Sequence, residues 1–107
     1  METKQIEVYS EATNNAIVRM PSRSFPGVVV QGDSLSILFD DAMEILERLD
    51  PKRDEDLFFV ALSLAEDLEA RLKHYEAVTS KHGFPLPYVR DPTRSAARFA
   101  PADNSDF

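Results

Sequence analysis

Three groups of side chains in this sequence could do chemistry: carboxylates, histidines and arginines. Asp40, Asp41 and Glu44 lie close together, and carboxylate oxygens are preferred ligands of divalent cations. One predicted helix would supply all three, whereas such sites usually draw ligands from several elements, so we interpret them as a solvent-exposed acidic face. His74 and His82 are too far apart for the paired histidines of a helical zinc site. We therefore predict no metal site.

Arg90, Arg94 and Arg98 recur at every fourth position near the end of the sequence. On a helical turn they would share one side, where they could bind the phosphate of a ligand or nucleotide. Alternatively, they could pair with carboxylates of the same chain. The acidic composition of the preceding segment favours this second interpretation, and phosphate binding stays the alternative.

The sequence contains no pattern typical of an enzyme. It has no cysteine, no serine in a nucleophile elbow and only three glycines. Gly32 stands alone where a phosphate-binding loop would need several glycines. We interpret the tyrosines and phenylalanines as core or interface residues. The sequence therefore predicts a protein without catalytic activity and without a cofactor.

The net charge of −7 is concentrated in the middle of the chain. Residues 1–31 are balanced, residues 32–69 carry twelve acidic against three basic residues, a net of −9, and residues 70–107 have a net of +2. Nucleic-acid binding depends on lysines and arginines that displace counterions, so we do not expect direct binding of nucleic acid. A basic protein partner suits this surface, because opposite charges accelerate encounter.

The composition also bears on location. No apolar run approaches the length of about 20 residues that crosses a bilayer as a helix. The N-terminal residues lack the basic and then apolar arrangement of a secretion signal. Because the chain has no cysteine for disulfide bonds, these features together predict a cytoplasmic protein without a membrane segment.

The elements that would position these side chains begin with a small sheet. Alternating and short apolar runs predict an antiparallel meander of three strands, at about residues 4–10, 15–20 and 27–31. Gly32 can adopt backbone angles that other residues avoid, and Asp33 or Ser34 can cap a following helix. That helix, about residues 34–49, has one apolar stripe and is expected to lie on the sheet.

A second helix is predicted over about residues 54–82, with Gly83 as its stop signal. Its apolar stripe comprises Leu57, Ala61, Leu64, Leu68, Leu72, Tyr75 and Val78. Residues 57–60 are apolar on nearly all sides, so more than one surface must bury them. Two explanations are open: a homodimer formed through residues 57–78, or a C-terminal tail that folds back over the helix.

The expected fold class is α+β. A three-stranded antiparallel sheet backed by one helix is followed by a long second helix and an extended, proline-rich tail. Residues 1–83 would form a single domain. Residues 84–107 would form a partly docked tail with a short helical turn near residues 93–100 and a mobile end.

The segment around the third strand resembles the core of the HicB-like antitoxins over residues 25–49. The resemblance rests on Pro26, Gly27, Gln31, Gly32, Asp33, Ser34 and Leu35, followed by Ala42, Glu44 and Leu46. It implies a fold of the partial ribonuclease-H type. It also implies a partner, a small basic ribonuclease toxin whose active site is blocked by the antitoxin.

The rest of the chain departs from that family. HicB-like proteins usually return to a fourth strand after this helix, whereas a long second helix is predicted here, and no DNA-binding unit is recognisable. Residues 19–35 also resemble a small uncharacterised bacterial family with a Pro-x-Arg-x-Phe-Pro-Gly and Gln-Gly-Asp core.

Three functions are compatible with these features. The first is a non-enzymatic neutraliser of the antitoxin or immunity type, whose acidic helix face meets a basic partner and whose exposed phenylalanines anchor it. Its candidate residues are Asp40, Asp41, Glu44, Glu47, Phe58 and Phe59. The second is a structural or regulatory homodimeric adaptor. The third is a binder of a small ligand or nucleotide that uses Arg90, Arg94 or Arg98.

Overall fold

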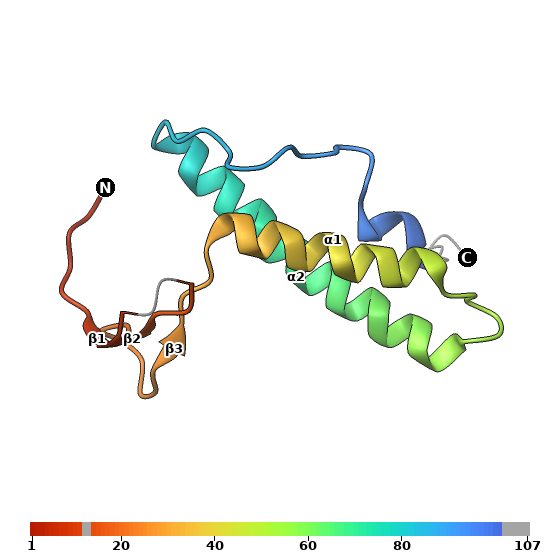
Figure 1. Cartoon of the computed structure of the whole chain (residues 1–107), viewed down its shortest axis with the longest axis horizontal. Coiled ribbons are helices and arrows are strands. Elements are labelled where there is room, and N and C mark those ends of the chain that lie inside the picture. Colours follow the sequence, from red (N-terminus) through yellow and green to blue (C-terminus); the bar gives the residue numbers. More distant parts are fainter. Residues whose placement is uncertain (12–13, 102–107) are drawn as a thin grey trace, which may run out of the picture.

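The computed structural model describes residues 1–11 and 14–101 (Figure 1). In chain order its elements are β1 (Glu7–Ser10), β2 (Ile17–Arg19), β3 (Gly27–Val28), α1 (Gly32–Arg48), α2 (Glu55–Lys81) and a 3-10 helix, η1 (Ala96–Phe99). The predicted α+β class, with a three-stranded antiparallel sheet and two helices, is confirmed. The predicted mobile end falls on residues 102–107, outside the described residues.

The sheet has the order β1-β2-β3 and is antiparallel throughout. Val8 pairs with Val18, and Val18 pairs with Gly27, so these three positions face the same side. On the other side Glu7 lies opposite Arg19 and forms a salt bridge with it. Each strand is shorter than predicted, because neighbouring strands pair over only a few residues.

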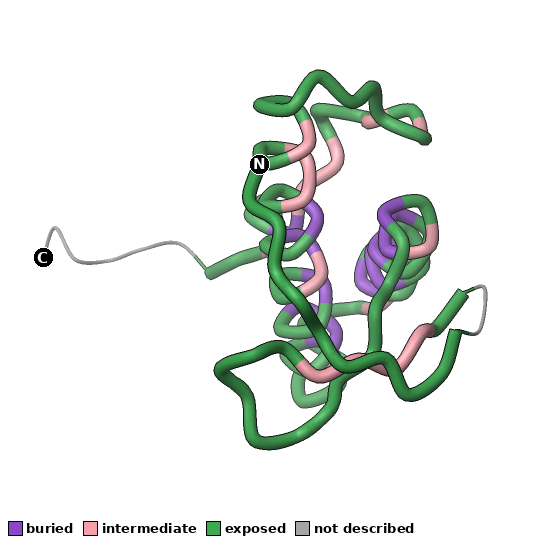
Figure 2. Tube along the Cα trace, turned by 90° about the vertical axis from the view of Figure 1, so that its left-hand side faces the viewer, coloured by how far each residue is buried: buried purple, intermediate pink, exposed green. Residues whose placement is uncertain are grey.

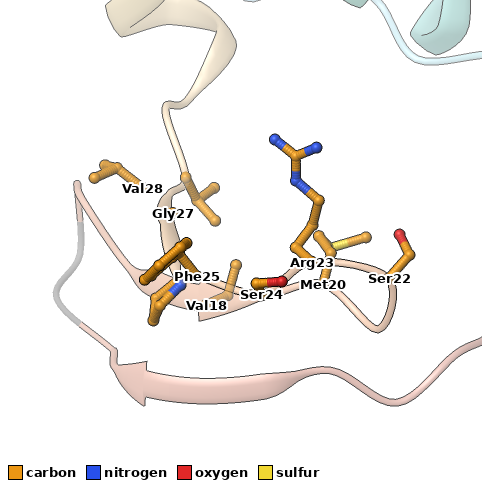
Figure 3. A pocket seen from close by; sticks show the side chains of 10 residues that line it. Val18, Met20, Ser22, Arg23, Ser24, Phe25, Gly27 and Val28 are labelled. Atoms are coloured by element: carbon orange, nitrogen blue, oxygen red, sulfur yellow. The ribbon is translucent and has the colours of Figure 1, made fainter.

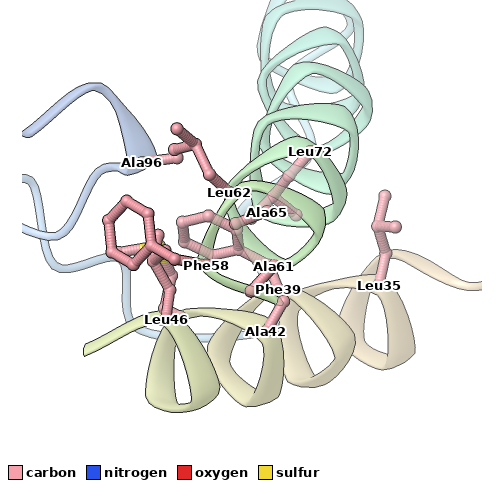
Figure 4. Packing of buried hydrophobic residues seen from close by; sticks show 11 residues of the cluster. Leu35, Phe39, Ala42, Leu46, Phe58, Ala61, Leu62, Ala65, Leu72 and Ala96 are labelled. Carbon is pink, nitrogen blue, oxygen red and sulfur yellow. The ribbon is translucent and has the colours of Figure 1, made fainter. Parts of the chain in front are cut away.

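The helices α1 and α2 run antiparallel and pack against each other (Figure 1). Their contact forms the core (Figure 4), which consists of Leu35, Phe39, Ala42, Met43 and Leu46 of α1, Phe58, Ala61, Leu62, Ala65 and Leu72 of α2, and Ala96 of η1. Burial of one large apolar side chain contributes on the order of 1.5–3 kcal/mol, so this helical hairpin is the main source of stability. The sheet, by contrast, is exposed or half-buried (Figure 2).

The expected layer of α1 on the sheet is not observed. The sheet lies beyond the N-terminal end of α1 (Figure 1), and among the described residues no strand packs on α1 as α2 does. The reason is that the core side of α1, which includes Phe39 and Leu46, packs against α2 instead, while Leu38 and Ile45 on its flank are left about half exposed. Gln31, with φ −66° and ψ 149°, is extended and separates the sheet from the helix.

The apolar stripe predicted on α2 is correct only in part. Leu57 and Leu64 of that stripe are about half exposed, and the core positions of this segment are instead Phe58, Leu62 and Ala65. Apolar residues surround the first turns of α2, so their spacing does not select one face. Packing against α1 and η1 selects it, and this is information from residues distant in the sequence.

Gly32 allows Tyr75 to pack closely against the start of α1, and it does not adopt an unusual turn conformation. It is the buried first residue of α1, and a Cβ atom placed on it would lie 2.2 Å from Cζ of Tyr75. Because α1 begins two residues before the predicted start, Gln31 is its N-cap, without a side-chain hydrogen bond. The predicted capping by Asp33 or Ser34 is therefore wrong, and Asp33 accepts a hydrogen bond from the Ser34 amide at 2.8 Å inside the first turn.

The C-terminal end of α2 confirms the predicted stop. Gly83 has φ 78°, a backbone conformation that favours glycine. The amide of Phe84 donates to the carbonyl of Thr79 at 3.0 Å, and the amide of Gly83 donates to the carbonyl of Ser80 at 3.1 Å. This is the hydrogen-bond pattern of a Schellman motif, which ends the helix and reverses the chain toward the tail.

Candidate functional site

The C-terminal tail returns along the helical hairpin (Figure 1). Its 3-10 helix η1 contacts α2, Ala96 is fully buried, and Phe99 packs against the core. The fold-back explanation for the apolar start of α2 is therefore observed. The homodimer through residues 57–78 stays a prediction.

Arg94 joins the tail to the acidic side of α1. Its Nε and Nη2 atoms donate to the two carboxylate oxygens of Glu47 at 3.1 and 2.7 Å, and its Nη1 lies 3.5 Å from Oδ1 of Asp40. The hydrogen bonds to Glu47 are the main cause that raises the pKa of the Arg94 guanidinium. Two of the four predicted partner-binding carboxylates are thus occupied by the chain's own tail.

Arg90 joins the tail to α2. Its Nε lies 3.1 Å from Oε2 of Glu76, and its guanidinium carbon lies 5.1 Å from the centre of the Phe39 ring. Tyr88 donates its hydroxyl proton to Oε2 of Glu76 at 2.9 Å. Burial, and then the hydrogen bond to this carboxylate, raise the pKa of Tyr88. The tail is therefore attached to both helices by charged groups.

Glu69 is a buried carboxylate that the sequence analysis missed. It is 6% exposed, and its Oε1 accepts hydrogen bonds from the Ala96 amide at 3.0 Å and the Ser95 hydroxyl at 3.1 Å. Its Oε2 has no hydrogen-bond partner among the described residues, although Lys73 and Arg90 lie 3.6 and 3.7 Å away. The sequence pattern could have indicated this burial, because Glu69 lies four residues after the core residue Ala65 and three residues before the core residue Leu72.

The other residues of the predicted partner site divide into exposed and buried groups. Asp41 and Glu44 are exposed on α1, and Glu44 lies 3.9 Å from Arg48. Phe59 is 47% exposed, but Phe58 is 6% exposed, since it packs into the hairpin core. The prediction of Phe58 as a partner anchor is therefore wrong.

Two hollows lie near these elements. One, of about 390 Å³, lies near the loop between α1 and α2 and is lined by Leu49, Pro51, Phe58, Phe59, Arg98, Phe99 and Pro101. The other, of about 620 Å³, lies on the sheet (Figure 3) and is lined by Val18, Met20, Ser22, Arg23, Ser24, Phe25, Pro26, Gly27, Val28 and Val29. Arg98 lines the first hollow and also shares a smaller one with Glu47 and Arg94, whereas Arg90 shares another with Arg94. Arg90 and Arg94 already pair with Glu76 and Glu47, so the guanidinium groups are directed at carboxylates of the same chain.

The motif shared with HicB-like proteins lies at the junction of sheet and hairpin. Pro26 precedes β3 and Gly27 opens it; Gln31 is the N-cap of α1, which Gly32, Asp33 and Ser34 then begin. Within residues 1–11 and 14–101, no group of three or more histidine, aspartate or glutamate side chains is placed to hold a metal ion. None of the helices in that part of the chain is long and apolar enough to cross a membrane.

Comparison with known proteins gives a family and no function. No curated protein and no solved structure matches the chain. Residues 1–88 match the sequence profile described as "Family of unknown function (DUF6959)", so the match includes the sheet, both helices and Tyr88. Since it covers 88 of 107 residues, the chain belongs to the DUF6959 family.

Proposed function

We propose that the protein is a non-enzymatic protein-interaction module that neutralises a basic partner protein by covering its active surface. The HicB-like resemblance supports this proposal through the order of strand, short link and helix start that its motif occupies, although α1 does not lie on the sheet as that family's fold implies. The net charge of −7 supports it as well, since a basic partner would be attracted over a distance of about 8–10 Å at moderate salt.

The observation that carries the proposal is the outer face of α1, defined as Ile37, Asp41 and Glu44. Residues four and seven apart share one side of a helix, so the three side chains are neighbours. Ile37 is 61% exposed, although it is apolar, and two exposed carboxylates lie beside it. An apolar contact ringed by carboxylates suits a partner surface that presents an apolar anchor among lysines or arginines.

The tail limits the site to this face. Arg94 pairs with Glu47 and also contacts Asp40, so its single positive charge offsets one of their two negative charges in the folded chain. Asp41, together with Glu44, which lies 3.9 Å from Arg48, therefore forms the acidic part of α1 that the tail leaves open to a partner. Phe59 stays a second candidate anchor, because about half of it is exposed.

The experiment is capture of interacting proteins by the tagged full-length chain, together with rescue of cells that express a toxic neighbouring gene. The test variant is Asp41→Lys/Glu44→Lys, and the control is Glu2→Lys/Glu11→Lys, which changes the net charge equally at exposed N-terminal positions. We expect the wild type and the control to capture a basic protein and to rescue growth, and the test variant to lose both. Equal capture by both variants, or no basic protein and no rescue with the wild type, contradicts the proposal.

A second candidate is a homodimeric adaptor that associates through residues 57–78. Leu57 and Leu64 favour it, because both are about half exposed on α2. Light scattering behind a sizing column tests it: a dimer has twice the chain mass of 12.1 kDa at low and high concentration, whereas a single-chain mass at both contradicts it. The small-ligand alternative is less favoured, because Arg90 and Arg94 already bind carboxylates.

A further inference from the structure

One face of the sheet is apolar and has no cover among the described residues. The pairing of Val8 with Val18 and of Val18 with Gly27 defines this face. Met20 and Val29 directly follow β2 and β3, and both line the same hollow as Val18. We call Val8, Val18, Met20 and Val29 the sheet face. Val8 and Met20 are about half exposed, and the 620 Å³ hollow lies over this face (Figure 3).

A sheet of this size needs a covering layer. Three strands become independently stable when their apolar face packs against something. Here β1 has four residues, β2 three and β3 two, and the helices do not cover them. The sheet face is therefore an apolar surface that no described helix covers.

The helical hairpin also has an uncovered apolar face. Leu38 and Ile45 are seven residues apart on α1, and Leu57 and Leu64 are seven apart on α2, so each pair shares one side of its helix. All four side chains are about half exposed. We call these four residues the hairpin face.

The hairpin face lies on the side away from the tail. Leu38 precedes Asp40 by two residues, and Ile45 precedes Glu47 by two, which is a rotation of about 200° on a helix. Asp40 and Glu47 bind Arg94 of the tail. The tail therefore covers one side of the hairpin and leaves the hairpin face open.

The two uncovered faces have complementary charge. Arg23 is the charged residue that lines the hollow on the sheet, and residues 1–31 as a whole have three acidic and three basic residues. Asp41 follows Leu38 by three residues and precedes Ile45 by four, so it borders the hairpin face, and residues 32–69 have a net charge of −9. A sheet face placed on a hairpin face would bring Arg23 toward this acidic border.

The sheet cannot reach the whole hairpin face of its own chain. Residues 29–31 link β3 to α1, and three extended residues span about 10 Å. Ile45 lies thirteen residues after the first residue of α1, about 20 Å along the helix. A second copy of the chain is free of this tether.

We propose that two copies of the chain form a two-fold symmetric dimer in which the sheet face of each copy covers the hairpin face of the other. In this arrangement the sheet face and the hairpin face form the layer of a sheet on helices that α+β domains use. The assembly stops at two copies, because each copy covers one hairpin face and has its own hairpin face covered. It specifies the geometry of the homodimeric candidate function and does not depend on the basic partner.

The test uses one glutamate substitution on each face. Met20→Glu disrupts the sheet face and Leu64→Glu disrupts the hairpin face, while Val89→Glu is the control, because Val89 is 98% exposed on the tail. Light scattering behind a sizing column is expected to give dimers for the wild type and the control, and single chains for both face variants at the same concentration. Circular dichroism checks that the variants are folded, and Val8→Glu with Leu57→Glu provides a second pair.

Mixing the two face variants gives the decisive result. The Met20→Glu copy keeps an intact hairpin face and the Leu64→Glu copy keeps an intact sheet face, so an equimolar mixture is expected to form a heterodimer with one good interface. If light scattering gives the mass of a single chain for the wild type, both this inference and the homodimeric candidate function are overturned. If Met20→Glu stays dimeric, or if the mixture stays monomeric at millimolar concentration, only the sheet-on-hairpin geometry is overturned, and a dimer through residues 57–78 stands.

Discussion

Replacement of Glu69 tests the attachment of the tail to α2. In Glu69→Ala, the Ala96 amide and the Ser95 hydroxyl lose their acceptor, at 3.0 and 3.1 Å. A hydrogen bond to a charged group contributes about 1.5–3 kcal/mol, and two such bonds set the upper end of the effect. The two cations near Glu69 are not left buried without a partner. Lys73 is exposed to solvent, and Arg90 keeps its contact with Glu76 at 3.1 Å.

The expected loss in the free energy of unfolding is therefore about 3 kcal/mol for Glu69→Ala. Glu69→Gln keeps an oxygen acceptor but loses the negative charge, so its expected loss is about 1–2 kcal/mol. Glu66→Ala is the matched control: it is an exposed glutamate on the same helix, and its expected effect is within about 0.5 kcal/mol.

Two measurements check this reasoning. Denaturant unfolding gives the stability of the three variants, and hydrogen exchange at the Ala96 amide reports tail docking directly. We expect this amide to exchange much faster in Glu69→Ala and at the wild-type rate in Glu66→Ala. If Glu69→Ala matches Glu66→Ala in stability and leaves the exchange of Ala96 unchanged, the buried carboxylate does not hold the tail.

Two further predictions concern glycine packing and pH. Gly32→Ala is expected to lower the free energy of unfolding by about 1–2 kcal/mol in thermal unfolding, because its Cβ would overlap the Tyr75 ring. Gly27→Ala serves as the control, since a Cβ at Gly27 would have no atom within 4 Å. Equal effects of the two substitutions would contradict the packing role of Gly32. Tyr88 has a raised pKa in the folded chain, so its contribution to stability is complete below the unfolded pKa of about 10 and decreases above it. Unfolding between pH 8 and pH 11 should therefore show a steeper loss for the wild type than for Tyr88→Phe, and parallel curves would contradict the coupling to Glu76.

Features encoded by neighbouring residues could be predicted from the sequence. Both helices begin and end within two residues of their predicted limits, since a proline after Asp50 and a glycine after His82 set their ends locally. The antiparallel meander was likewise accessible from short apolar runs separated by polar loops. Such signals lie inside a window of a few residues, so they need no knowledge of the rest of the chain.

Features that depend on distant partners could not be predicted in this way. Gly32 has the sequence signature of a turn, but its role is set by Tyr75, which a later helix brings against it. Glu69 has the signature of a surface residue on a charged helix, and only the returning tail turns it into a buried acceptor. The exposure of Leu64 and the burial of Phe58 likewise follow from where α1 and η1 pack on α2.

If the protein binds a basic partner as proposed, the tail determines which part of α1 that partner can meet. With the tail docked, Arg94 holds Glu47 and contacts Asp40, so such a partner would meet mainly Asp41 and Glu44 on the outer face. With the tail displaced, it would meet all four carboxylates, and its attraction to α1 would rise accordingly. A partner that needs the whole acidic side must therefore compete with Arg94. Tail docking through Glu69 would set the strength of that competition and hence the selectivity of the surface.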